Sequence, residues 1–161
     1  MPTCAQKRLR EYCKEILGYE EDEEFVGHIP AGIEVIKAFE EGVGPGPNLK
    51  DLHFDTSRGL TSAWNKKAFD LIRINFCSKN RKDRNFPSRS NHYFAKLIED
   101  RFKRLWKAWK AAQPRTDSDG HVENFEEVES RMVQSKVAEL KVSRITTRRL
   151  EVSTVRSSCD V

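Results

Sequence analysis

The longest regular pattern in the chain is an apolar stripe that runs through residues 94–109. Its members recur at steps of three, one, four, three, one and three residues, which is the spacing of one face of an α-helix. They are Phe94, Leu97, Ile98, Phe102, Leu105, Trp106 and Trp109. A stripe of this width predicts a helix of about four turns that packs one side against a core. Ser88 or Ser90 is its predicted N-cap, and Gln113 and Pro114 end it.

Two shorter helices are predicted near the start of the chain. Residues 3–17 carry apolar side chains on one face, with Thr3 placed to cap the first turn and Gly18 placed to end the helix. Residues 28–42 repeat the pattern over a shorter length, with Pro30 near the first turn and a glycine at the end.

A third helix is predicted from Thr61 or Ser62, either of which can cap it, as far as Lys79. Glycine and proline are frequent between residues 42 and 60, so this segment is predicted to be a connector with the freedom of a hinge. The basic segment 79–90 has few apolar residues, and its like charges predict an exposed, mobile loop.

The last helical segment is residues 122–149, with glutamates early and arginines late, as the helix dipole favours. Its apolar residues drift around the axis, which indicates either a helix docked across two neighbours or a loose coiled-coil arm. The tail 150–161 is predicted to be unpacked. Apolar and polar residues do not alternate over strand lengths. We therefore expect an all-α fold of about five helices, a compact helical domain with a long C-terminal helix and a loose tail.

Charge is distributed unevenly along the chain, although the net charge is only +4. Residues 18–57 hold ten acidic and two basic side chains, whereas residues 58–115 hold sixteen basic and four acidic ones. We expect three segments within one structural domain: N-terminal helices and an acidic linker (1–57), a basic helical hairpin (58–115), and a C-terminal helix and tail (116–161). Such asymmetry predicts an anionic partner for the basic hairpin.

The function expected from this pattern is nucleic-acid binding without catalysis, since basic side chains that neutralise phosphates gain affinity by releasing counterions. DNA is preferred over RNA as the partner. The predicted contact residues are Lys79, Arg81, Lys82, Arg84, Arg89, Lys103, Lys107 and Lys110, with Arg148 and Arg149 as a second basic point. Two alternatives stay open. The acidic segment could lie against the basic one and cancel its field, or the chain could be a protein-binding adaptor or homodimer built on residues 122–149.

Other chemistries have weaker support. The four cysteines and four histidines are scattered, without the close pairs that a zinc site needs, so we expect reduced thiols, no metal and no cofactor. His121, Val122 and Glu123 match part of a zinc deaminase signature, but its Pro-Cys-x-x-Cys partner is missing, and no enzyme is expected. The three tryptophans could stack on bases, but their places in apolar stripes favour core packing.

The segments "AWNKKAFDLI" and "HYFAKLIEDRFKRLWKAWK" together resemble Myb/SANT-like helical DNA-binding domains, and the resemblance implies a helical fold that binds DNA. Trp64, Trp106 and Trp109 do not have that family's regular spacing, so the resemblance assigns no recognition residue. The later segments "WKAAQPR", "EEVESRM" and "AELKVSRITTRR" resemble uncharacterised proteins of mushroom-forming fungi, which implies no known activity.

No apolar run approaches the length of a membrane helix, and the first residues lack the apolar region of a signal peptide. We therefore expect an intracellular protein without a membrane partner. The short basic runs "KNRKDR" and "TTRR" favour the nucleus over the cytoplasm.

Overall fold

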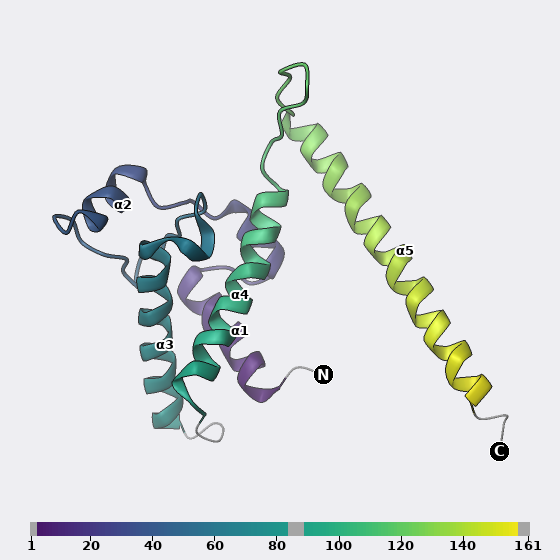
Figure 1. The fold of residues 1–161 in the computed structure, drawn as a ribbon, viewed down its shortest axis with the longest axis horizontal. Helices are drawn as coiled ribbons and strands as arrows, with labels where there is room; N and C mark the ends of the chain where they lie inside the picture. The colour runs from purple at the N-terminus through teal and green to yellow at the C-terminus, as the bar shows by residue number, and fades with distance from the viewer. Residues whose placement is uncertain (1–2, 84–88, 158–161) are drawn as a thin grey trace. The chain divides into compact units, whose positions relative to one another are not determined.

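The computed structural model describes residues 3–83 and 89–157, with side chains described for 3–81 and 89–146. Helices are the main regular structure of this part of the chain, and its only β-type pairings are two isolated bridges (Figure 1). The predicted all-α fold with a long C-terminal helix is confirmed. The α-helices are α1 (Cys4–Leu17), α2 (Ile33–Glu40), α3 (Ala63–Asp83), α4 (Asn91–Ala111) and α5 (Phe125–Ser157), and the short 3-10 helices are η1 (Asp22–Gly27) and η2 (Gly59–Thr61).

The chain divides into two compact units, Met1–Lys110 and Ala111–Val161. The first unit contains α1 to α4 almost entirely, and the second contains α5 and the turn before it. All the predicted contact residues between Lys79 and Lys110 therefore belong to the first unit.

The first helix has the ends that its sequence predicts. The Thr3 hydroxyl accepts a hydrogen bond from the Gln6 backbone N–H, and the Gln6 side chain accepts one from the Thr3 N–H, which together form a capping box. Gly18 ends the helix in the left-handed conformation at φ 68°, where a side chain would be strained. Local sequence alone is therefore sufficient to place α1.

Three helix boundaries differ from the prediction. The second helix begins at Ile33 rather than near Pro30, because the Ala31 N–H is bonded to the Phe54 carbonyl at 2.9 Å and holds the preceding residues extended. The third continues to Asp83, so the first part of the predicted loop at 79–90 is helical. The last continues to Ser157 through much of the predicted tail, because glycine and proline are absent after residue 120.

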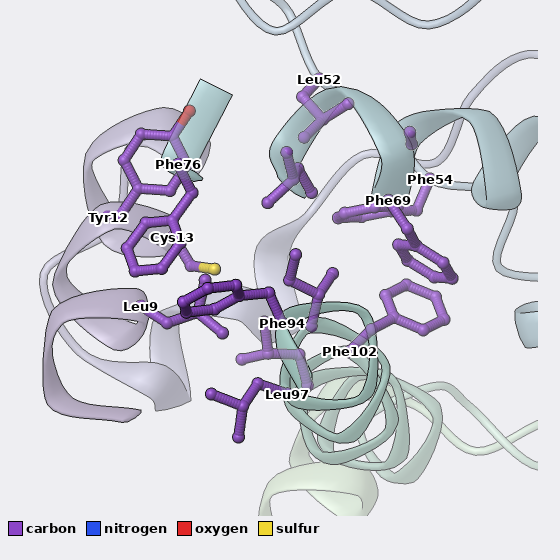
Figure 2. Packing of buried hydrophobic residues seen from close by; sticks show 14 of the residues in the cluster. Leu9, Tyr12, Cys13, Leu52, Phe54, Phe69, Phe76, Phe94, Leu97 and Phe102 are labelled. Carbon is purple, nitrogen blue, oxygen red and sulfur yellow. The ribbon is translucent and has the colours of Figure 1, made fainter. Parts of the chain in front are cut away.

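The core of the first unit lies between α1, α3 and α4, and its aromatic rings form two groups (Figure 2). In one group, the Phe76 ring lies 5.5 Å from Tyr12 and 5.7 Å from Phe94, centroid to centroid. In the other, the Phe102 ring lies 4.7 Å from Phe54 and 5.0 Å from Phe69. The apolar stripe of α4 thus contributes a ring to each group, which explains why it has to extend over the whole helix.

The connector between α2 and α3 belongs to this core. Leu52 and Phe54 are buried, and the amide of the fully buried Asn65 bonds to the backbone of Asp55 in both directions. Gly59 lets the chain pass close to α4, since a β-carbon there would come within 3.0 Å of the Trp106 ring. These contacts replace the predicted hinge with a fixed segment.

Candidate nucleic-acid interface

The fourth helix has a buried apolar side and an exposed basic side. Every apolar residue of the predicted stripe from Phe94 to Leu105 is buried, and the two tryptophans that complete it are partly buried. Lys103, Lys107 and Lys110 are exposed and fall within about 11 Å along the helix axis. No acidic residue follows Asp100 in α4. The exposed side of its last two and a half turns or so, from Lys103 onward, therefore carries no carboxylate.

One basic residue of α4 lies on the buried side instead. The Arg101 side chain is only 7% exposed, and its two terminal nitrogens bond to both carboxylate oxygens of Asp22. It also donates to the Tyr19 hydroxyl at 3.0 Å. These bonds from Arg101 hold the pKa of Asp22 below its ordinary value. Burial alone would lower the pKa of Arg101, but the bonds to Asp22 and Tyr19 outweigh it and raise that pKa.

This ion pair locates part of the acidic segment relative to the basic helix. Lys103, Lys107 and Lys110 lie about 180–240° around the helix axis from Arg101, at 100° per residue. Asp22 therefore attaches to the side of α4 opposite the exposed lysines. Its neighbour Glu21 is turned toward α1, where it lies 3.3 Å from Lys14 and 3.8 Å from Arg10.

The exposed lysines of α4 are weakly engaged. The Lys103 ammonium is 3.8 Å from the Asp100 carboxylate, and the Lys110 ammonium lies 5.5 Å above the ring of Trp106. Within the described residues, no hydrogen bond or ion pair is found for Lys107. These cations can approach an anion without first giving up a strong partner.

Three other predicted residues, Lys79, Arg81 and Arg89, form a separate group near the end of α3 and the start of α4. Lys79 is paired with Glu15 of α1 at 2.7 Å and lies over the Tyr12 ring, which explains why α3 stays helical there. Arg81 is exposed, and Arg89 lies over the Tyr93 ring at 5.9 Å.

Some predicted contacts cannot be placed at the level of side chains. Lys82 is within α3, but its side chain lies outside the described residues, as does the whole of Arg84. The side chains of Arg148 and Arg149 on α5 also lie outside the described residues.

The predicted basic surface is divided along α4. Lys103 lies twelve residues after Asn91, the first residue of the helix, which corresponds to about 18 Å along its axis. The group around Arg81 and Arg89, near the start of α4, is therefore more than half the length of that helix away from the group at Lys103 to Lys110. The sequence places both in one hairpin, but only the second group is a short, regular array.

The tryptophans are held by the core, as their places in the stripes predict. The indole N–H groups of Trp64, Trp106 and Trp109 donate to backbone carbonyls of His53, Thr56 and His28, at 2.8, 2.9 and 3.0 Å respectively. Each indole thus satisfies a backbone carbonyl in a connecting segment that has few backbone hydrogen bonds of its own. All three indoles therefore have a hydrogen-bond partner within the first unit.

Two buried polar groups were not singled out by sequence patterns. Arg101 and Asn65 both occupy core-facing positions of otherwise apolar stripes, and that placement is the signal that could have identified them. Near Asn65, burial raises the pKa of Asp55, but hydrogen bonds from Ser57 and Arg58 outweigh this and lower it to about 2. Both groups bond within the fold, Arg101 to Asp22 and Tyr19, and Asn65 to the backbone of Asp55 and Gly59.

The partial deaminase motif has a structural use in the second unit. Glu123 accepts hydrogen bonds from Arg131 on α5, at 2.8 and 2.9 Å, and from the Arg115 backbone N–H. His121 is turned instead toward Glu127, at 3.1 Å. Among the residues that the structure describes, no group of three or more histidine, cysteine, aspartate or glutamate side chains is placed to hold a metal ion.

The thiols of the first unit are unpaired. Cys4, Cys13 and Cys77 are free cysteines, and burial raises the pKa of Cys13 to about 12. A buried thiol with so high a pKa is a poor nucleophile and acts as a small apolar side chain. Cys159 lies outside the described residues.

Comparison of the chain with protein-family models, curated proteins and solved structures found no match. None of the described helices combines the length and the apolar character that a membrane span requires. Inference about function therefore depends on the arrangement of this chain's own side chains.

Proposed function

We propose that the chain is a non-enzymatic nucleic-acid-binding protein that contacts phosphates through the exposed side of α4. The observation that supports this most strongly is the array of Lys103, Lys107 and Lys110, which are exposed, close together and on the side opposite the Asp22 ion pair. Nucleic acids are dense lines of negative charge, and such an array gains affinity by displacing their counterions.

The two basic groups contribute differently in this proposal. The α4 array makes the main contacts because its ammonium groups have weak partners. Arg81 and Arg89 add contacts at the other end of α4. Lys79 contributes least, since it is already held by Glu15 at 2.7 Å and would have to leave that carboxylate.

Duplex DNA is the preferred partner. A rigid helix offers cations at fixed intervals, which suits the regular phosphate spacing of a duplex better than a flexible single strand. The resemblance to Myb/SANT-like domains also implies DNA. We place the protein in the nucleus on the basis of its basic runs, and imaging of a fluorescent fusion with and without those runs tests this location.

A salt series with random-sequence duplex and single-stranded oligonucleotides tests the proposal. The Lys103→Gln, Lys107→Gln, Lys110→Gln variant should bind duplex more weakly, and the slope of log affinity against log salt should decrease by about 2.7 for three lost phosphate contacts. Circular dichroism should report unchanged helix content, because glutamine is as good a helix former as lysine.

The matched control removes three positive charges elsewhere in the same unit. Lys7, Lys37 and Lys50 are exposed on α1, α2 and the connector, and their replacement by Gln gives the same net charge. This control should keep the wild-type salt slope. Equal losses in both triple variants would mean that only net charge matters, and an unchanged slope in the α4 variant would remove α4 from the interface.

A second candidate is a protein-binding adaptor that uses α5. It is favoured by the exposure of apolar side chains on that helix, among them Val133 at 57% and Leu140 at 53%. An adaptor of this kind predicts no affinity for DNA or RNA at any salt concentration, so the same oligonucleotide series separates the two functions.

A further inference from the structure

The fifth helix carries an apolar stripe that the described residues leave uncovered. Residues 133–146 are all exposed, including Val133, Val137 and Leu140 at 57%, 45% and 53%. At 100° per residue these three side chains fall within about 60° around the helix axis. Isolated helices are marginal in water, and most helices are stabilised by covering such a stripe.

Charges of opposite sign stand at the two ends of this stripe. Glu129 lies four residues before Val133, and Arg144 lies four residues after Leu140, so both are on the same side of the helix as the stripe. Neither has an oppositely charged residue three or four positions away within α5. Both also lie beyond the first and last turns, so the helix dipole does not explain their placement.

The order of charged and apolar residues along this stripe is complementary to the same order read in the opposite chain direction. Glu129 and Arg144 are equidistant from the point between Lys136 and Val137, and so are Val133 and Leu140. Two antiparallel copies of α5 crossing at that point would place Glu129 against Arg144 of the second copy, twice, and Val133 against Leu140. A parallel pair would place like charges together.

We infer that α5 pairs with α5 of a second copy of this chain in an antiparallel arrangement through Val133, Val137 and Leu140, closed at each end by a Glu129 to Arg144 ion pair. The inference extends the adaptor candidate and does not depend on nucleic-acid binding, because α4 and its lysines belong to the other unit.

Molar mass measured by sedimentation equilibrium across a concentration series, on nuclease-treated full-length chain, tests the pairing. The wild type should shift from the mass of one copy toward two as concentration rises. Glu129→Arg and Arg144→Glu should each stay near one copy, because each single change places like charges together at both ends. The Glu129→Arg, Arg144→Glu double variant should recover the wild-type mass, and so should a mixture of the two single variants.

A matched pair of apolar changes locates the surface. Val133→Ser should abolish the mass shift, whereas Val142→Ser should leave it unchanged, because Val142 is as exposed, at 63%, but faces away from the stripe. A wild type that remains one copy at every concentration would overturn the inference. The antiparallel pairing would be overturned if both single charge variants still reached the mass of two copies. It would also be overturned if Val142→Ser, and not Val133→Ser, abolished the mass shift.

Discussion

The fourth and fifth helices are both amphipathic and both rich in charge, yet the apolar side of α4 is covered whereas residues 133–146 of α5 are exposed. The stripe of α4 keeps to one side of the helix, and its Phe102 ring is 3% exposed. On α5, Val137 of the stripe formed by Val133, Val137 and Leu140 is 45% exposed. The difference indicates that the core of its own chain orders α4, whereas residues 133–146 of α5 leave their apolar side chains exposed within the described part of the chain.

The two helices also use arginine differently. Arg101 of α4 is buried and is neutralised by Asp22 from a distant part of the sequence. Arg131 of α5 is partly exposed and bonds locally, to Glu123 and to the carbonyls of Ala111 and Gln113. The first interaction joins elements of a core, and the second only fixes the start of a helix.

The largest effect that separates the two helices should come from truncating a core ring. Phe102→Ala should cost about 3–5 kcal/mol of unfolding free energy, because it leaves a cavity between Phe54 and Phe69. Val137→Ala, an exposed change on α5, should cost less than about 0.5 kcal/mol at low protein concentration. Urea unfolding followed by tryptophan fluorescence and far-UV circular dichroism measures both. Similar losses would mean that α5 is as buried as α4.

The ion pairs should show a smaller contrast of the same kind. Asp22→Asn should cost about 3 kcal/mol, because it leaves the buried Arg101 cation without its counter-charge. Much of that stability should return when Arg101→Met is added, since an apolar side chain of similar length removes the buried charge. In the turn before α5, Glu123→Gln should have little effect, because Arg131 keeps its carbonyl partners. The same urea series compares the three variants.

The smallest contrast should appear in the pH dependence of stability. His28 stacks on Phe25 and its Nε2 accepts the Phe54 N–H, and burial lowers its pKa from 6.5 to about 4, with a smaller contribution from His53. Between those two values the unfolded chain holds a proton that folded His28 does not. Unfolding free energy should therefore fall as the pH is lowered through this window, by about 2 kcal/mol once partial exposure is allowed for.

Two variants assign that pH dependence. His28→Gln should flatten the slope between pH 6.5 and about 5, where Asp22 and Asp55 remain ionised and do not contribute. His121→Gln should not, because the His121 side chain is exposed in the second unit. An unchanged slope in His28→Gln would assign the effect to another group.

Sequence patterns predict the elements of this fold where local rules decide. The α4 stripe, the Thr3 cap and the Gly18 stop were all predictable, because each depends on residues a few positions apart. The end of α3 was not, since Lys79 stays helical through a contact with Glu15, 64 residues away. Boundaries set by tertiary partners leave no local signal.

The candidate site was predictable in its chemistry and less so in its layout. Counting charges identifies Lys103, Lys107 and Lys110 as members of a basic segment, and their helical spacing predicts that they share the exposed side of α4. The same count could not show that these lysines lie apart from Arg81 and Arg89 in space. It also could not show that Arg101 is buried and absent from the basic surface. Those distinctions depend on the direction and length of the helix and on the buried partner of Arg101.

The indole of Trp109 bonds to the carbonyl of His28, 81 residues earlier, and that of Trp106 bonds to Thr56, 50 residues earlier. The early connecting segments therefore receive these bonds only after the ribosome has synthesised the end of α4. Until then residues 28–56 have few ways to satisfy their own carbonyls. We expect this unit to complete its folding only after α4 has been synthesised, and to fold more slowly than helical proteins built from contacts between sequence neighbours.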